Sequence, residues 1–273
     1  MIRDMETLGT KVAGLPRVPN FRDLGGHLTR SGGTVRRGLA FRAGELGRLD
    51  GPDRRAIARL GIRTVYDLRT EDERRVQPER DRLPTSVAYV VADVLADAPE
   101  GNPAQVMGLL ERPDELRAAF GAGRAAAIFT TRYRQFVGLA SARAAYGRLF
   151  TGLAEEERRP ALFHCTTGKD RTGWAAAALL LLLGVPDDLV MADFLRSNRE
   201  LAPTFRPWLD RFAAGGGDPG LLEPMMVARP EYLEAALEEV GRTFGTIEGY
   251  FAAGLGIGAV GQARLRAAFV APA

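Results

Sequence analysis

Residues 160–173 read Pro-Ala-Leu-Phe-His-Cys-Thr-Thr-Gly-Lys-Asp-Arg-Thr-Gly. The run 161–164 is short and apolar, which is typical of a buried strand. We expect a helix from about Thr172 to Leu183, because helix-forming apolar residues fill this stretch and Gly184 and Pro186 follow it. A strand, a tight loop and a helix in this order gather backbone N–H groups at a helix N-terminus, which predicts an anion-binding site.

Five residues separate Cys165 from Arg171. This spacing allows the loop to curl around one tetrahedral phosphate, with the thiol below the phosphorus atom and the guanidinium binding two oxygens. The helix N-terminus and the arginine also favour the thiolate, which is the form of cysteine that attacks phosphorus. We therefore predict Cys165 as the nucleophile and Arg171 as the phosphate clamp. The other loop positions that we expect to bind phosphate or substrate are Thr166, Thr167, Gly168, Lys169 and Thr172.

Asp170 is the predicted general acid, because the leaving oxygen needs a proton and a nearby dianionic phosphate favours the protonated carboxyl. Its alternative role is a favourable charge at the helix N-terminus. Lys169 is expected to bind a second anionic group of the substrate. His164 is expected to hold the loop by hydrogen bonding, with direct catalysis as the weaker hypothesis. Thr172 either caps the helix or contacts the thiolate, and the alternative for Cys165 is a small buried hydrophobe.

The length of 273 residues suits one large α/β domain over residues 1–273, or one domain plus a subdomain, and 46% hydrophobic and 26% charged residues are typical of a globular protein with a sizeable core. One cysteine and two histidines exclude an internal disulfide and make a multi-Cys or His-rich metal site untenable. We predict no cofactor and no metal.

The charge pattern and the apolar runs bear on partners and location. Arginines alternate with acidic residues and the net charge is only +3, which argues against a nucleic-acid polymer as partner. The longest apolar run, 174–183, is too short for stable membrane insertion, and no secretory signal is recognisable. The expected location is cytoplasmic by default, and signal-independent secretion stays open.

Periodicity and turn residues place the remaining elements. Strands are expected at 62–68 and 86–91, and short strands among the turns of 17–50. Helices are expected at 53–60, 125–150 and 199–213, and from Pro230 onward.

The loop 164–173 resembles the Cys-x5-Arg signature of a family of bacterial tyrosine and lipid phosphatases. The resemblance extends over nearly the whole chain. The further segments that carry it are Asn20-Phe21-Arg22-Asp23-Leu24-Gly25-Gly26, Tyr66-Asp67-Leu68-Arg69, Tyr133-Arg134-Gln135-Phe136, Ala192-Asp193-Phe194-Leu195-Arg196-Ser197-Asn198, Arg229-Pro230-Glu231-Tyr232-Leu233 and Gly249-Tyr250.

This resemblance implies a cysteine phosphatase fold of the dual-specificity type, with a mixed central sheet flanked by helices and a helical lid at about 199–228. It implies metal-free hydrolysis through a phosphocysteine, with Asp170 as the general acid and Lys169 associated with phosphoinositide activity. Asp93 is the reserve candidate for the acid. Arg22 is an auxiliary candidate from the N-terminal signature.

Three functional hypotheses follow from these residues. The first is a phosphatase that acts on phosphotyrosine proteins or phosphoinositides. The second is a phosphomonoesterase for a small molecule such as a nucleotide or sugar phosphate, which would use the same loop with a different pocket. The third is a phosphate-binding module without turnover, which the combination of nucleophile, clamp and acid disfavours. Sulfur-transfer and arsenate-reducing enzymes also have anion-binding cysteine loops, but they would lack the Lys-Asp-Arg string.

Overall fold

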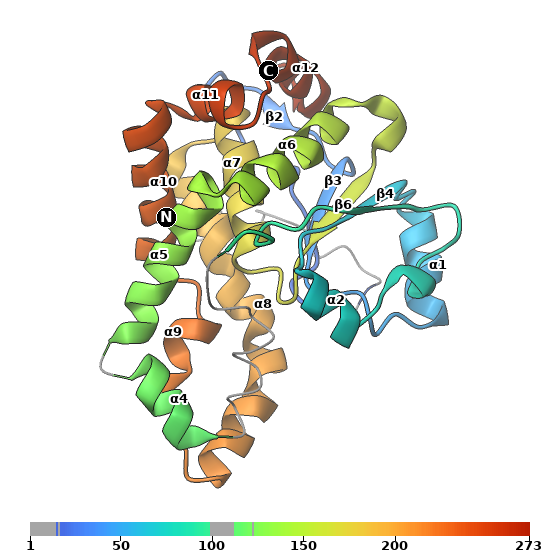
Figure 1. Ribbon diagram of the computed structural model, residues 1–273. Coiled ribbons are helices and arrows are strands. Elements are labelled where there is room, and N and C mark those ends of the chain that lie inside the picture. Colours follow the sequence, from blue (N-terminus) through green and yellow to red (C-terminus); the bar gives the residue numbers. More distant parts are fainter. Residues whose placement is uncertain (1–14, 16, 99–111, 122) are drawn as a thin grey trace, which may run out of the picture.

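A five-stranded mixed sheet forms the centre of the molecule, as the family resemblance implies (Figure 1). The computed structural model describes residues 15, 17–98, 112–121 and 123–273. The strand order is β1-β3-β6-β4-β5, in which β1 is antiparallel to β3 and the other neighbours are parallel. The strands of this sheet are β1 (Arg22–Asp23), β3 (Ala40–Ala43), β4 (Thr64–Asp67), β5 (Ala88–Val91) and β6 (Ala161–His164).

Both faces of the sheet are covered, which explains why the first three residues of β6 are apolar. Successive side chains of a strand point to opposite faces. Ala161 and Phe163 belong to the large core beneath α7 (Arg171–Leu182), whereas Leu162 belongs to the second core, which it shares with Ile57 of α1 (Gly51–Arg59). Every residue of β6 is therefore buried. Cys165 directly follows the carboxyl end of this strand, which is the middle strand of the sheet.

The remaining helices surround this core, with a second, two-stranded sheet at the periphery. That sheet pairs β2 (Thr34–Val35) with β7 (Val270–Ala271). No helix in the described ranges is long and apolar enough to cross a membrane. The other helices are α2 (Glu71–Val76), α4 (Pro113–Phe120), α5 (Arg124–Gly138), α6 (Ala140–Ala154), α8 (Asp187–Ala214), α9 (Glu223–Met226), α10 (Pro230–Phe244), α11 (Ile247–Gly249) and α12 (Ala259–Phe269).

The prediction of one helix over 125–150 is wrong. Leu139 has an extended conformation, with φ −62° and ψ 144°, and it separates α5 from α6. The two helices pack against different partners, since α5 lies on α10 and α6 lies on α12. A single straight helix does not make both contacts, so tertiary packing overrides the continuous helical pattern.

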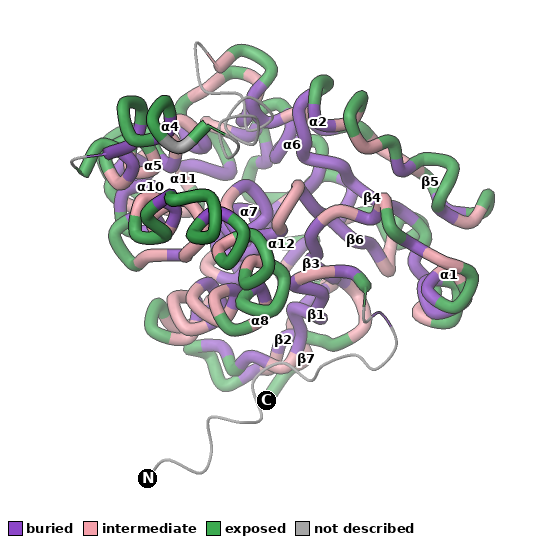
Figure 2. Tube along the Cα trace, turned by 90° about the horizontal axis from the view of Figure 1, so that it is seen from below, coloured by how far each residue is buried: buried purple, intermediate pink, exposed green. Residues whose placement is uncertain are grey.

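A helical arm projects from the main body below the sheet (Figure 1). It consists of α4, α9 and the C-terminal half of α8, and it has a small core of its own. Much of the outer part of α8 is exposed, whereas β3, β4 and β6 are buried (Figure 2). The fully or nearly buried members of the arm core are Leu116, Phe120, Ala125, Phe212 and Leu222.

Candidate active site

The backbone carbonyls of the loop after β6 are held from outside the loop. The Glu45 N–H donates to the Thr166 carbonyl at 3.0 Å. The Asn20 side-chain amide donates to the Gly168 carbonyl at 2.8 Å and to the Thr167 carbonyl at 3.4 Å. Because the C=O and N–H of a trans peptide point in opposite directions, these contacts turn the following N–H groups toward the concave side of the loop. The loop is thus shaped to surround an anion.

Gly168 is the position at which the loop turns most sharply. Its φ is +69°, and a Cβ atom there would lie 2.3 Å from the Ala43 carbonyl oxygen. Only glycine avoids both the left-handed strain and this clash. The Gly168 carbonyl also accepts a hydrogen bond of 2.8 Å from Arg42 of the neighbouring strand β3. The loop therefore packs directly against the end of β3.

Cys165 lies at the base of this loop and is 1% exposed. The preceding His164 is completely buried behind the loop, where its Nδ1 lies 3.2 Å from the Cys165 carbonyl oxygen. Its Nε2 lies 3.3 Å from the Glu79 carboxylate. The imidazole is therefore placed between a buried acid and the cysteine backbone, a position that suits the predicted loop-holding role.

Arg171, the first residue of α7, forms a bidentate ion pair with Glu73 of α2. The two terminal guanidinium nitrogens lie 2.6 and 2.7 Å from the two carboxylate oxygens. Burial opposes ionisation of Glu73, but the charge and hydrogen bonds of Arg171 outweigh it and lower the pKa of Glu73 to about 2. A guanidinium has five N–H donors, so this pairing fixes its direction and leaves donors for a phosphate.

Asp170 is partly exposed, and its carboxyl contacts a distant residue, Tyr133, as well as the adjacent Lys169. The hydroxyl of the fully buried Tyr133 donates to Asp170 Oδ1 at 2.9 Å. The Lys169 ammonium lies 3.3 Å from the same oxygen. Both contacts hold the carboxyl at the end of the loop, directly before the start of α7.

Lys169 is buried under the helical arm. Its ammonium donates to the Met225 carbonyl at 2.6 Å and to the Val227 carbonyl at 3.2 Å, at the end of α9. It also lies 5.1 Å from the centre of the Phe129 ring. Burial lowers the pKa of Lys169, and the charge of Asp170 opposes that effect. In this arrangement the predicted contact with a second substrate anion requires α9 to move.

The three threonine hydroxyls of the loop have different surroundings. Thr166 donates to the Glu73 carboxylate, so it belongs to the network that orients Arg171. The Thr167 hydroxyl accepts a hydrogen bond of 3.3 Å from the Lys169 N–H. The Thr172 hydroxyl is buried and has no hydrogen-bond partner among the residues that the structure describes. This places an unused donor at the start of α7.

The two outlying candidates lie on opposite sides of the loop. Asp93 accepts hydrogen bonds from the Glu71 N–H at 3.1 Å and the Leu95 N–H at 3.0 Å, next to α2. Burial raises the pKa of Asp93, while the charges of Arg74 and Arg171 lower it. Arg22 is completely buried and pairs with Asp193 of α8, so it lies behind the loop.

A buried acidic cluster beside β6 has the composition of a metal site but already contains a cation. Asp67, Glu79 and His164 have ligand atoms within 4.8 Å of one another. The Arg69 guanidinium lies 2.7 Å from the Asp67 carboxylate and 2.9 Å from that of Glu79. The arginine neutralises the charge that a metal would balance, so this cluster fits a structural network better than a metal centre.

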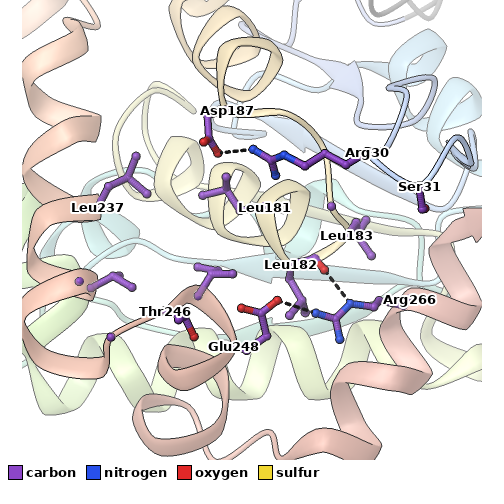
Figure 3. A pocket seen from close by; sticks show the side chains of 15 residues that line it. Arg30, Ser31, Leu181, Leu182, Leu183, Asp187, Leu237, Thr246, Glu248 and Arg266 are labelled. Atoms are coloured by element: carbon purple, nitrogen blue, oxygen red, sulfur yellow. Dashed lines mark hydrogen bonds and ion pairs between the residues drawn. The ribbon is translucent and has the colours of Figure 1, made fainter.

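A groove of about 730 Å³ lies at the other end of α7, where the helix ends at Leu182 (Figure 3). Two ion pairs line it, Arg30 with Asp187 at 3.1 Å and Arg266 with Glu248 at 2.9 Å. Because α7 has 12 residues, this groove lies roughly 18 Å along the helix from the cysteine loop. It is separate from the candidate active site.

Sequence reasoning missed several residues that shape the site. Glu73 stands in a capping box with Thr70, a pattern that signals a helix start and not an arginine partner. Arg42 interrupts an otherwise apolar strand, and a charge at such a position indicates a buried partner. Tyr133 and Asn20 lie in segments that carry the family resemblance, but nothing in the sequence assigns them contacts to Asp170 and the loop carbonyls.

The geometry defines a class of protein. A buried cysteine at the end of a central parallel strand, a loop with outward-held carbonyls and an arginine at the start of the next helix together form the phosphate-binding loop of cysteine-dependent phosphatases.

Comparisons with known proteins identify the family. The sequence matches the tyrosine phosphatase family over residues 13–271. It is 33% identical over 239 residues to a Cupriavidus necator protein assigned by name to the tyrosine-protein phosphatases, covering 85% of this chain and 80% of that protein. It is 33% identical over 258 residues to the triple specificity protein phosphatase PtpB of Mycobacterium tuberculosis, covering 86% of this chain and 91% of that protein.

A third relative, a tyrosine-protein phosphatase of Nostoc commune, is 32% identical over 181 residues, which span 66% of this chain and 55% of that protein. The chain therefore belongs to the tyrosine phosphatase family. It is a phosphoric monoester hydrolase, and its substrates are phosphorylated molecules.

Proposed function

We propose that Cys165 is the nucleophile of a two-step phosphatase reaction. The thiolate attacks phosphorus, the bond between phosphorus and the ester oxygen breaks, and a phosphocysteine forms. Water then attacks the phosphocysteine, which releases inorganic phosphate and restores the thiolate. The position of Cys165 beneath the concave side of the loop supports this assignment.

Arg171 and the loop amides stabilise the phosphoryl group during transfer. The observation that carries this proposal is the outward anchoring of three consecutive carbonyls, Thr166 to Gly168, by groups outside the loop. Donors that are fixed before the substrate arrives need no reorganisation when charge develops on the phosphoryl oxygens. Glu73 holds the Arg171 fork in place for the same purpose.

Asp170 is the general acid of the first step and the general base of the second. Its hydrogen bond from Tyr133 supports this role, because the carboxyl is held at the mouth of the loop and remains partly exposed to a leaving group. Asp93 is the weaker candidate, since two backbone N–H groups already occupy its carboxylate oxygens. The buried hydroxyl of Thr172 is suited to contact the thiolate or the departing phosphate.

We infer that the substrates are phosphotyrosine proteins, phosphoinositides or both. The relative named as a triple specificity phosphatase supports a broad range of phosphate esters. The helical arm at about 199–228, with α4, acts as a lid of this single domain. Lys169 becomes available to a second substrate anion when the lid moves away from it.

Substitution of the cysteine tests the nucleophile. Cys165→Ser should abolish turnover of a phosphotyrosine peptide but still bind it, because the loop amides and Arg171 remain. Turnover and peptide affinity are measured on the same preparation. Normal turnover by this variant would contradict the assignment.

A substrate comparison tests the class of ester. We expect kcat/KM for a phosphotyrosine peptide or a phosphoinositide to exceed that for nucleoside monophosphates by about 100-fold, or roughly 2.7 kcal/mol of transition-state binding. The reverse preference would favour a small-molecule phosphomonoesterase. Cys165→Ser serves as the control for contaminating activity.

A further inference from the structure

Two buried arginines lie side by side behind the phosphate-binding loop. Arg22 of β1 and Arg42 of β3 are directly opposite each other in the antiparallel pair, and neither is exposed. Like charges at such positions repel each other, and burial removes the water that would screen them. Placing these two buried guanidinium groups side by side therefore costs the folded protein free energy.

One carboxylate serves both arginines. Asp193 of α8 accepts from Arg22 Nε at 2.9 Å and from Arg42 Nη1 at 2.8 Å. The hydroxyl of the fully buried Ser197, one helical turn further along α8, lies 3.3 Å from Arg22 Nη2 and 3.4 Å from Arg42 Nη2. The cluster thus contains two cations, one anion and one neutral hydroxyl.

The cluster keeps a surplus charge at neutral pH. Burial and the charge of Arg22 lower the pKa of Arg42 to about 10, which still leaves it protonated. Burial opposes ionisation of Asp193, but Arg22 and Arg42 outweigh it and hold its pKa well below the usual range. The nearby His27 has its pKa lowered by burial and adds no positive charge. Two positive charges therefore face one negative charge.

The surplus charge is in contact with the loop. Arg42 Nη2 donates to the Gly168 carbonyl at 2.8 Å, and Arg42 lies close enough to Cys165 to interact with it electrostatically. A cation that polarises a peptide carbonyl strengthens the N–H of the same peptide as a donor. This N–H belongs to Lys169 in the loop, where it donates to the Thr167 hydroxyl at 3.3 Å, a long bond that an anion in the loop can replace.

We propose that the cluster of Arg22, Arg42 and Asp193 carries one uncompensated buried positive charge that favours the Cys165 thiolate and strengthens oxyanion binding in the loop. Arg42 is in this sense a positioning and electrostatic residue, and it does not touch the substrate. The proposal deepens the proposed function and rests on the assignment of Cys165.

Substitutions at Ser197 separate the effect of the cluster's charge from the effect of its packing. Ser197→Asp replaces the hydroxyl by a carboxylate within reach of both arginines and cancels the surplus, while the contacts of Arg42 with Asp193 and the Gly168 carbonyl remain. Ser197→Asn has nearly the same shape and leaves the surplus intact. If the cluster acted only through packing, the aspartate would leave the ionisation of the Cys165 thiol unchanged. If the cluster acts through its charge, the aspartate removes its effect on that ionisation.

The readout is the pH dependence of Cys165 alkylation by iodoacetamide, which reports the thiolate. Cys165 is the only cysteine of the chain, so the label has one site. We expect the alkylation midpoint of Ser197→Asp to lie about one pH unit above that of Ser197→Asn. Besides the adjacent His164 and Asp170, the groups that act on the thiol are Arg42, Arg171, Lys169, Tyr133 and Tyr146.

A second pair of variants repeats the test from the arginine side. Arg42→Met removes the surplus and leaves Arg22 and Asp193 as a balanced pair, while Arg42→Lys keeps the charge. We expect inorganic phosphate to bind the Arg42→Met enzyme about tenfold more weakly than the Arg42→Lys enzyme, as measured by calorimetry. Thermal unfolding establishes that each compared variant is folded.

Equal alkylation midpoints in folded Ser197→Asp and Ser197→Asn would overturn the proposal. Should the Ser197 variants fail to fold, equal phosphate affinities of the two Arg42 variants would do the same. Neither result depends on turnover. A Cys165→Ser enzyme that retains activity would instead refute the proposed function, so the two failures are distinguishable.

Discussion

In the proposed mechanism, the surroundings of the Asp170 carboxyl decide how the leaving group receives its proton. Tyr133 and Lys169 both contact Oδ1, so the carboxyl is held from one side and open on the other. A group fixed in this way transfers a proton efficiently only to an oxygen that the loop places beside it. The contribution of Asp170 should therefore depend on how much the leaving oxygen needs that proton.

Asp170→Asn should reduce kcat/KM for an alkyl phosphate by about 10²–10⁴-fold and much less for an aryl phosphate with an acidic leaving group. The asparagine keeps the shape of the carboxyl but does not donate the proton. Steady-state kinetics on the two esters measures the difference. Equal losses on both esters would assign Asp170 a structural role.

Tyr133→Phe should lower kcat on the alkyl phosphate with little change in KM, because Asp170 loses its anchor while the phosphate contacts remain. We expect a loss of about tenfold, corresponding to roughly 1.4 kcal/mol. An unchanged kcat would show that Lys169 alone positions the carboxyl.

Helix α2 contributes to the loop through Glu73. The capping box with Thr70, the N-cap residue of the helix, orients the Glu73 side chain. Glu73→Gln should destabilise the protein by about 3–5 kcal/mol and reduce kcat/KM, because it leaves Arg171 buried and without its anionic partner. Glu71→Gln is the matched control on the same helix, since the Glu71 carboxylate is exposed and its ion pair among the described residues is with the neighbouring exposed Arg75. Equal stability of the two variants in urea would contradict the ion-pair account.

The turn at Gly168 connects β6 to α7, and its backbone conformation sets the shape of the loop. Gly168→Ala should lower the free energy of unfolding by about 1–3 kcal/mol because of the left-handed backbone conformation alone. The close contact of the new Cβ with the Ala43 carbonyl should lower it further. Gly138→Ala is the control, because no atom lies within 4 Å of a Cβ there. Loss of phosphate binding in the first variant only is the expected result.

The strand–loop–helix unit was predictable because its signals are local. The apolar run 161–164, the glycine of the loop and the stop after α7 all lie within 25 residues. The break at Leu139 was not predictable, because it depends on which helices α5 and α6 pack against. The bond between Arg42 and Asp193 joins residues 151 positions apart, and a single sequence carries no signal of such a pairing.

The candidate site likewise contains residues that local sequence signals predict and residues whose contacts only the fold determines. Cys165 and Arg171 were predicted because their spacing alone implies a phosphate loop. The partner of Arg171 could not be predicted, since any of several acidic residues had the right chemistry and only the fold brings Glu73 to it. The position of Lys169 under α9 likewise depends on how the helical arm folds back.

The whole molecule consists of a main body with two cores on the sheet and an arm with a small core of its own. Phe212→Ala should therefore destabilise the arm selectively, lowering the free energy of its local unfolding by about 3–5 kcal/mol. Hydrogen exchange should quicken in α4, α9 and the outer part of α8, while β6 and α7 stay protected. Trp208→Ala, at an exposed position on the same helix, is the control.

Acid stability of the folded protein should reflect Glu73. Its pKa is about 2 in the folded state and 4.5 in a free side chain. The stabilisation that this shift represents, about 3 kcal/mol, comes from Arg171 with further contributions from Thr166 and Thr70, is fully present above the free value and is lost as the pH falls toward the folded one. The Tm difference between the natural protein and Glu73→Gln should be constant near neutral pH and shrink in acid. A difference that grows in acid would reverse the sign of this linkage.

The central claim is that the phosphoryl group passes through the sulfur of Cys165. Rapid acid quench of the Asp170→Asn enzyme during turnover of an aryl phosphate, followed by mass spectrometry of its peptides, tests this directly. Because Asp170 is the proposed base of the second step, Asp170→Asn should slow hydrolysis of the intermediate and let it accumulate. We expect one phosphoryl group on the peptide that contains Cys165 and none in Cys165→Ser. Turnover with no phosphoryl group on that peptide, or with one on another residue, would contradict the account.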